Sequence, residues 1–104
     1  MNNSIASELK YPYFASPERA KSIQEGYKII KIGMELNEVK EILGEPDEIQ
    51  DLYEPKIKKP KKIGFTYWYI IQRTKRTGSQ NKKNETLVRI SFGLSGQVVK
   101  VDRW

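Results

Sequence analysis

Residues 64–72 form the segment that most restricts how this chain can fold. The run Gly-Phe-Thr-Tyr-Trp-Tyr-Ile-Ile-Gln is dense in aromatic and β-branched residues, which favour extended strands. Alternation along a strand puts Phe65, Tyr67, Tyr69 and Ile71 on one face, and Thr66, Trp68, Ile70 and Gln72 on the other. Both faces carry apolar or aromatic side chains. If helices pack on one face, the apolar side chains of the other face must be covered by another segment or remain exposed.

Two further strands are predicted after this one. Residues 86–92 place Val88, Ile90 and Phe92 on one face, and residues 97–103 follow a turn at Leu94-Ser95-Gly96. A long polar hairpin loop, residues 73–85, joins the first two strands.

Two helices are predicted before the strands. Ser16 can cap the first helix and Pro17 suits its first turn. Its apolar stripe runs through the residues Ala20, Ile23, Tyr27 and Ile30, and Gly33 is expected to end it. The second helix covers residues 36–43 with an apolar face of Leu36, Val39, Ile42 and Leu43, and Gly44 and Pro46 stop it.

This order of elements predicts one α+β domain over residues 1–104, with two N-terminal helices packed on one face of a three-stranded antiparallel sheet. Its parts are an N-terminal arm (1–15), the two helices (16–46), a basic, proline-containing loop (47–63) and the three-stranded meander (64–103).

The chain contains neither Cys nor His, which excludes many kinds of site. Disulfides, Cys or His zinc sites, Cys nucleophiles and His general bases are all impossible. The carboxylates Glu38, Glu41 and Glu45 share a face of the second helix opposite its apolar stripe, which is typical of a solvated surface. We therefore expect no catalytic residues, no metal and no cofactor, and hence a protein that is not an enzyme.

Charge is segregated along the chain. Residues 35–54 hold eight acids and one base, whereas residues 56–83 hold ten bases and no acid, within a net charge of +6. Such a division indicates either an electrostatically steered partner or two solvated blocks that pair within the fold.

A protein partner is the predicted ligand. If the helices cover one face of the central strand, Trp68 and Ile70 remain on the other as candidate anchors, unless the N-terminal arm covers them. The candidate basic groups around these anchors are Lys58, Lys59, Arg73, Lys75 and Arg76. The alternative partner-binding set is acidic and consists of Glu38, Glu41, Glu45, Asp47 and Glu48. A second class of partner is nucleic acid, because bases stack on Trp and basic side chains meet phosphate.

The segment from Ile32 to Pro46 resembles the SmpA/OmlA family of small BamE-like outer-membrane lipoproteins, whose fold resembles each repeat of the β-lactamase inhibitor protein. The resemblance rests on Gly33, Met34, Val39, Leu43, Gly44 and Pro46, followed by Tyr67 and Tyr69 and then by Phe92, Gly96 and Val98. It implies two helices on a three-stranded antiparallel sheet. The sequence departs from the family pattern at Glu35, where a Ser or Thr cap is usual, and its 104 residues contain no Cys to lipidate and do not begin with the pattern of a signal peptide.

The resulting prediction is a non-catalytic, cytoplasmic inhibitor or immunity protein that covers the active site of a cognate toxin. The alternatives are an outer-membrane assembly lipoprotein domain of the BamE-like type, which would be periplasmic or at the outer membrane, and an RNA-binding module. No apolar run is long enough to span a membrane, and the sequence does not indicate an oligomeric state.

Overall fold

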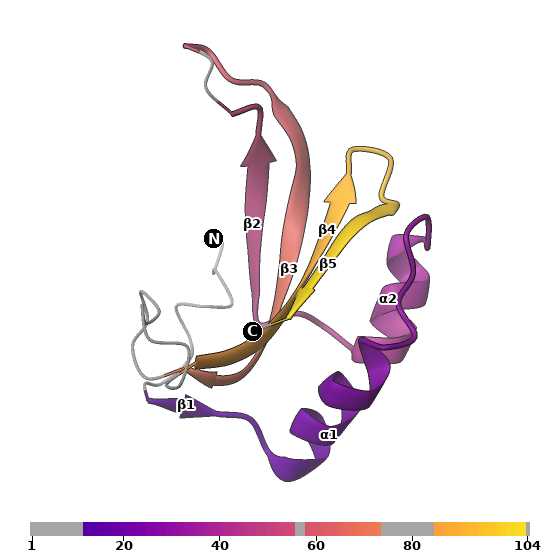
Figure 1. Cartoon of the computed structure of the whole chain (residues 1–104), viewed down its shortest axis with the longest axis vertical. Helices are drawn as coiled ribbons and strands as arrows, with labels where there is room; N and C mark the ends of the chain where they lie inside the picture. The colour runs from indigo at the N-terminus through magenta and orange to yellow at the C-terminus, as the bar shows by residue number, and fades with distance from the viewer. Residues whose placement is uncertain (1–11, 56–57, 74–84, 104) are drawn as a thin grey trace.

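The computed structural model describes residues 12–55, 58–73 and 85–103. Along the chain it contains β1 (Tyr13–Phe14), α1 (Pro17–Gly26), α2 (Leu36–Leu43), β2 (Glu48–Tyr53), β3 (Lys62–Arg73), β4 (Glu85–Gly93) and β5 (Val98–Arg103). Figure 1 shows both helices on one side of a twisted sheet, and the β2–β3 connection projecting beyond the other strands.

The sheet is antiparallel and has five strands. The long strand β3 pairs with β4 along one edge, and β4 pairs with β5. The other edge of β3 is shared: β2 covers its first half and the two-residue β1 pairs at its end. The α+β class is therefore right, but the predicted three-stranded sheet is wrong.

The two missed strands explain the error. Residues 47–63 were expected to be a loop, yet Glu48–Tyr53 pair with β3 from Trp68 to Lys62. Most side chains of β2 are exposed, and its sequence shows no clear alternation of apolar and polar residues. The strand is held at the edge of β3 by backbone pairing. Residues 1–11 of the predicted arm and 74–84 of the predicted hairpin loop lie outside the described residues.

The first helix begins where its sequence predicts and ends earlier. The Ser16 hydroxyl accepts a hydrogen bond from the Arg19 amide at 3.2 Å, and Pro17 occupies the first turn. The helix ends at Gly26 rather than near Gly33. A Cβ at Gly26 would lie 2.7 Å from Leu43 Cδ2, so the glycine allows α1 and α2 to approach closely.

The second helix has the predicted bounds. The N-cap residue, Glu35, donates its amide to the side chain of Glu38 at 3.1 Å, which is the contact that the third helical residue makes in a capping box. Gly44 follows the helix with a φ of 81°, a conformation that favours glycine.

The hydrophobic core lies between the helices and one face of the sheet. Ile23, Val39 and Leu43 from the helices belong to the same buried cluster as Tyr67 and Tyr69. The sheet adds the buried residues Val88, Ile90, Phe92 and Val98. The predicted division of residues 65–71 between two faces agrees with this cluster, which includes Phe65 and Ile71 at its margin.

A β-bulge in β3 interrupts the alternation after Ile70. Ile70 faces Leu87 across the sheet while Gln72 faces Thr86, so Ile71 has no partner position in β4. Because of this extra residue, Arg73 lies on the face of Trp68, with its guanidinium carbon 5.0 Å from the Trp68 ring centre. Simple alternation would have placed Arg73 on the helix side.

Candidate functional site: the open face of the sheet

The predicted aromatic and apolar anchors differ in accessibility. Trp68 is partly buried on the face of the sheet opposite the helices. Ile70 lies on the same face but is 0% exposed, as is its partner Leu87. The expectation that Ile70 remains open to a partner is therefore wrong, because strand alternation fixes a face but not what covers it.

The predicted basic set does not form one surface. Lys58 and Lys59 are exposed in the β2–β3 connection, whereas Arg73 ends β3. The twelve residues of β3 separate these two positions, a length of roughly 36 Å at the usual rise of a strand. Arg73 is also buried, which contradicts its expected place in an exposed loop. Lys75 and Arg76 lie outside the described residues.

The predicted acidic set is also divided. Glu38, Glu41 and Glu45 are exposed on or just after α2, as expected. Asp47 is buried and Glu48 is half-buried, and both are bound within the fold. They are therefore not exposed beside the other three, and part of the acidic segment 35–54 pairs within the fold.

A hollow of about 320 Å³ opens on the face of the sheet that the helices do not cover. It crosses all four of the longer strands. Its lining residues are Gln50, Leu52, Thr66, Trp68, Arg89, Ser91, Val99, Lys100 and Asp102.

Strand register arranges this lining in two cross-strand rows. One row runs Gln50, Thr66, Ser91 and Lys100, from β2 to β5. The next row runs Glu48, Trp68, Arg89 and Asp102 across the same strands. Adjacent members of a row face each other directly, so each row acts as a line of neighbouring side chains.

The middle of the first row explains the hollow. Thr66 and Ser91 are short and lie between larger residues of the second row and the apolar side chains of Leu52 and Val99. Their hydroxyls hydrogen-bond each other at 3.1 Å, which satisfies both groups although both residues are buried. The result is a polar floor with partly apolar walls.

Two guanidinium groups lie against the Trp68 ring. The Cζ atoms of Arg73 and Arg89 are 5.0 Å and 5.3 Å from its centre, within the range of cation–π attraction. The indole Nε1 is buried and has no hydrogen-bond partner among the described residues. Trp68 therefore positions both arginines as well as forming a wall of the hollow.

The hollow contains one carboxylate and two cations. Asp102 Oδ2 lies 3.6 Å from Arg89 Nη2 and 3.5 Å from Lys100 Nζ. Both separations are long for charge-assisted hydrogen bonds. A single carboxylate is thus shared between two cations, and the three charged side chains of the lining sum to +1.

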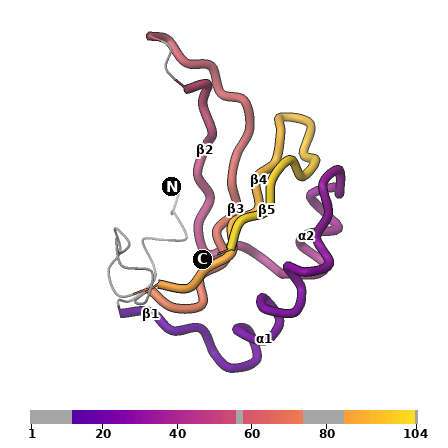
Figure 2. The backbone as a smooth tube through the Cα atoms, viewed as in Figure 1, coloured from indigo at the N-terminus to yellow at the C-terminus, as the bar shows by residue number. Residues whose placement is uncertain are grey.

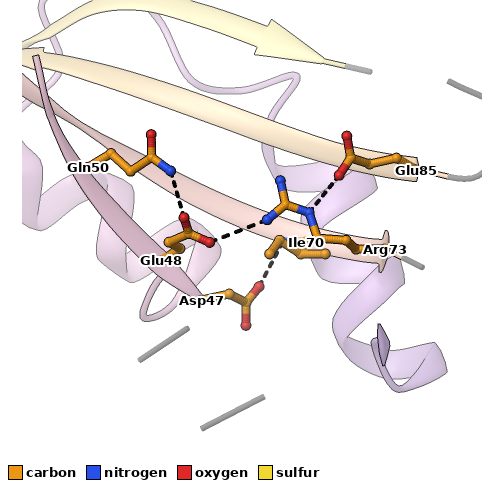
Figure 3. Close-up of polar contacts among 6 residues, drawn as sticks. All are labelled: Asp47, Glu48, Gln50, Ile70, Arg73 and Glu85. Atoms are coloured by element: carbon orange, nitrogen blue, oxygen red, sulfur yellow. Dashed lines mark hydrogen bonds and ion pairs between the residues drawn. The ribbon is translucent and has the colours of Figure 1, made fainter. Parts of the chain in front are cut away.

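Beside the hollow, Arg73 is enclosed by two carboxylates (Figure 3). Its Nε donates to Glu85 Oε2 at 2.5 Å, and its Nη1 to Glu48 Oε2 at 3.4 Å. The side chains of Arg73 and Glu85 are only 4% and 2% exposed. This cluster joins the end of β3 to the starts of β4 and β2.

Asp47 closes a gap at the shared edge of β3. Its Oδ2 accepts the Ile70 amide at 2.7 Å, between the parts of β3 that pair with β2 and β1. Its Oδ1 lies 3.2 Å from Arg19 Nη2, which ties this edge to α1. Figure 3 shows the carboxylate directed at Ile70. The Asp47 carboxylate thus accepts the hydrogen bond that the backbone of a neighbouring strand would otherwise accept from Ile70.

Sequence reasoning missed most of the lining of the hollow. The alternation of residues 86–92 could have indicated Arg89 and Ser91, since Val88, Ile90 and Phe92 occupy the opposite face. Gln50 and Leu52 carry no such signal, because the sequence of residues 47–63 predicts a loop. The bulge that brings Arg73 to Trp68 is also a product of pairing rather than of local sequence.

Comparison with protein-family models, with curated proteins and with solved structures finds no match to this chain. The resemblance to the SmpA/OmlA family thus stays a prediction. Among the described residues, no three acidic side chains are placed to hold a metal ion together. No helix in the described ranges is long and apolar enough to cross a membrane.

Proposed function

We propose that this chain is a protein-binding domain that covers its partner's active site with the open face of its sheet, as a toxin inhibitor or immunity protein does. The observation that carries the proposal is the hollow across β2 to β5. Its volume suits one or two inserted side chains, and hot spots of protein interfaces are such pockets filled by anchors.

The accessible walls support a protein ligand. Val99 is 55% exposed at the hollow, and Leu52 and Trp68 are partly exposed beside it. Charged groups at Arg89, Lys100 and Asp102 adjoin this apolar surface, in the manner of a polar rim around an interface core. The resemblance to a family whose fold resembles the repeats of an inhibitor protein points in the same direction.

An RNA-binding role has weaker support from this geometry. Stacking of a base requires a free aromatic face, and two guanidinium groups already lie against Trp68. The exposed Lys58 and Lys59 also lie at the opposite end of β3 from Arg73, so these basic groups form no continuous track for a phosphate backbone.

Site-specific photo-crosslinking in the cells from which the chain derives tests the proposal. A benzoylphenylalanine at Val99 should capture a protein, whereas the same residue at the exposed position Glu41 on α2 should not. The captured protein should inhibit growth when expressed alone, and co-expression of the parent chain should relieve that inhibition. Equal capture at both positions, or a captured protein that is harmless alone, would contradict the proposal.

A further inference from the structure

The hollow has a chemistry that selects among protein partners. Its apolar walls, Leu52 and Val99, line the same hollow as the cations Arg89 and Lys100. An occupant that satisfies both parts must present an apolar group and a negative charge close together. We propose that the hollow binds an acidic side chain of the partner, flanked by an apolar one, with Arg89 and Lys100 as the residues that determine this specificity.

Arg89 is arranged in advance for such a contact. Its guanidinium lies against Trp68 and faces Asp102 across the strands, so it is held at the wall of the hollow before any partner arrives. A guanidinium that is fixed by an aromatic ring loses little freedom on binding a carboxylate and can bind it with two parallel hydrogen bonds.

The charges around the hollow favour a carboxylate over an ammonium group. Asp102 is the one acid of the lining, and it faces two cations at more than 3.4 Å from each. An incoming carboxylate can therefore share Arg89 and Lys100 with Asp102. The neighbouring acids Glu48 and Glu85 are engaged by the buried Arg73, so they do not offer a competing site for a cation.

The approach of an acidic partner is also favoured. The whole chain carries a net charge of +6, and lysines 58, 59 and 61 are exposed in the connection that projects beyond the sheet (Figure 2). Exposed charges of this kind raise association rates more than affinity. The specific contact is thus expected at Arg89 and Lys100, and the steering at the lysines.

Peptide display on the immobilised full chain tests this inference, which rests on the proposed function. Random 12-residue peptides selected by the parent chain should be enriched in Asp or Glu next to an aliphatic or aromatic residue. A synthetic peptide of the selected sequence should lose at least tenfold in affinity when its acid becomes the matching amide. The same loss should follow from Lys100→Gln or Arg89→Lys, with less than additive loss when both sides are changed.

Two control variants locate the effect. Lys59→Gln, in the projecting connection, should change affinity less than twofold. Val99→Asp should abolish binding, because it places a charge on the apolar wall. If Val99→Asp abolishes binding while Lys100→Gln and Arg89→Lys do not weaken it, the face binds proteins but the carboxylate site is wrong.

The remaining outcomes also overturn the inference. These are selected peptides without acidic residues, no selected peptide, or an equal effect of Lys59→Gln and Lys100→Gln. A fluorescent ten-residue uridine oligonucleotide is the last probe. Binding of this RNA that Lys100→Gln removes would show that the hollow takes phosphate instead.

Discussion

At the scale of single residues, buried polar groups fix the ends of the strands. Arg73, Glu85 and Glu48 form a cluster in which the charged atoms are withdrawn from water. Burying an ion is costly unless it is paired and hydrogen-bonded, and here each partner depends on the others. The cluster therefore specifies the pairing of β3 with β2 and β4.

Glu85→Gln should lower the free energy of unfolding by about 3–5 kcal/mol, because it leaves a buried guanidinium without its main counterion. Urea denaturation at neutral pH measures the change. The double variant Arg73→Met with Glu85→Leu should lose less than Glu85→Gln, since it removes both fully buried charges and leaves only Glu48, which is half-buried and also accepts a hydrogen bond from Gln50. A loss below about 1 kcal/mol for Glu85→Gln would show that the pair is not buried as described.

Tyr69 provides a second residue-scale prediction. Its hydroxyl donates to the Gly44 carbonyl oxygen at 2.9 Å, and burial, assisted by the nearby Tyr67, raises its pKa above the ordinary value of 10.0. The folded state then holds this proton more tightly than the unfolded chain does. The stability it contributes is present below about pH 10 and is lost as the pH rises beyond that value.

Tyr69→Phe should therefore cost about 1 kcal/mol near pH 7, the usual value of one hydrogen bond. The difference between the parent and the variant should shrink at about pH 11, where the phenol of the unfolded parent is ionised. Urea denaturation of both proteins at several pH values gives the comparison. A difference that stays constant over this range would argue against a raised pKa.

At the scale of elements, close backbone contact decides how β3 and β4 fit together. Gly64 and Gly93 face each other across the two strands. A Cβ at Gly64 would overlap the carbonyl oxygen of Phe92, which the backbone cannot easily move. A Cβ at Gly93 would meet only Val99 Cγ1, at 3.7 Å. The two glycines therefore occupy paired positions but differ in the space available for a Cβ, so each serves as a control for the other.

Gly64→Ala should destabilise the fold by about 2–3 kcal/mol or more, because the strands must separate to admit the methyl group. Gly93→Ala should change stability by less than about 1 kcal/mol. Thermal unfolding of both variants measures the contrast. Equal effects would mean that the strands are not in this register.

At the scale of the whole molecule, one face of the sheet packs against the helices, and the other carries the hollow that we propose as the binding site. The helices bury Val39 and Leu43 against the aromatic face, where Tyr67 and Phe92 pack edge to face at 4.9 Å. The opposite face combines a buried end at Ile70 and Leu87 with the open hollow. Changes to the hollow can therefore alter binding without emptying the core.

Leu43→Ala should cost about 2–5 kcal/mol, the range for removing a buried leucine side chain, since Leu43 belongs to the core cluster. Leu94→Ala is the control, because Leu94 is exposed in the β4–β5 turn and should cost less than about 0.5 kcal/mol. Chemical denaturation of the two variants compares them directly. Similar losses would contradict the packing of α2 on the sheet.

Local sequence was enough to predict the elements that carry their own signals. The cap at Ser16, the bounds of α2 and the three long strands follow from capping residues, apolar periodicity and glycine stops, because these act over a few neighbouring residues. The α+β class follows from their order. The face of the core followed from alternation in residues 65–71.

Only the tertiary structure decided the edge strand β2, the bulge in β3 and the lining of the hollow. β2 forms because the edge of β3 offers it backbone partners, and Asp47 fills the gap that β2 leaves. The bulge after Ile70 brings Arg73 to Trp68, and strand register gathers the lining of the hollow from four strands. These features depend on pairing between residues far apart in the chain, where local propensity carries no information about register or about which groups become neighbours.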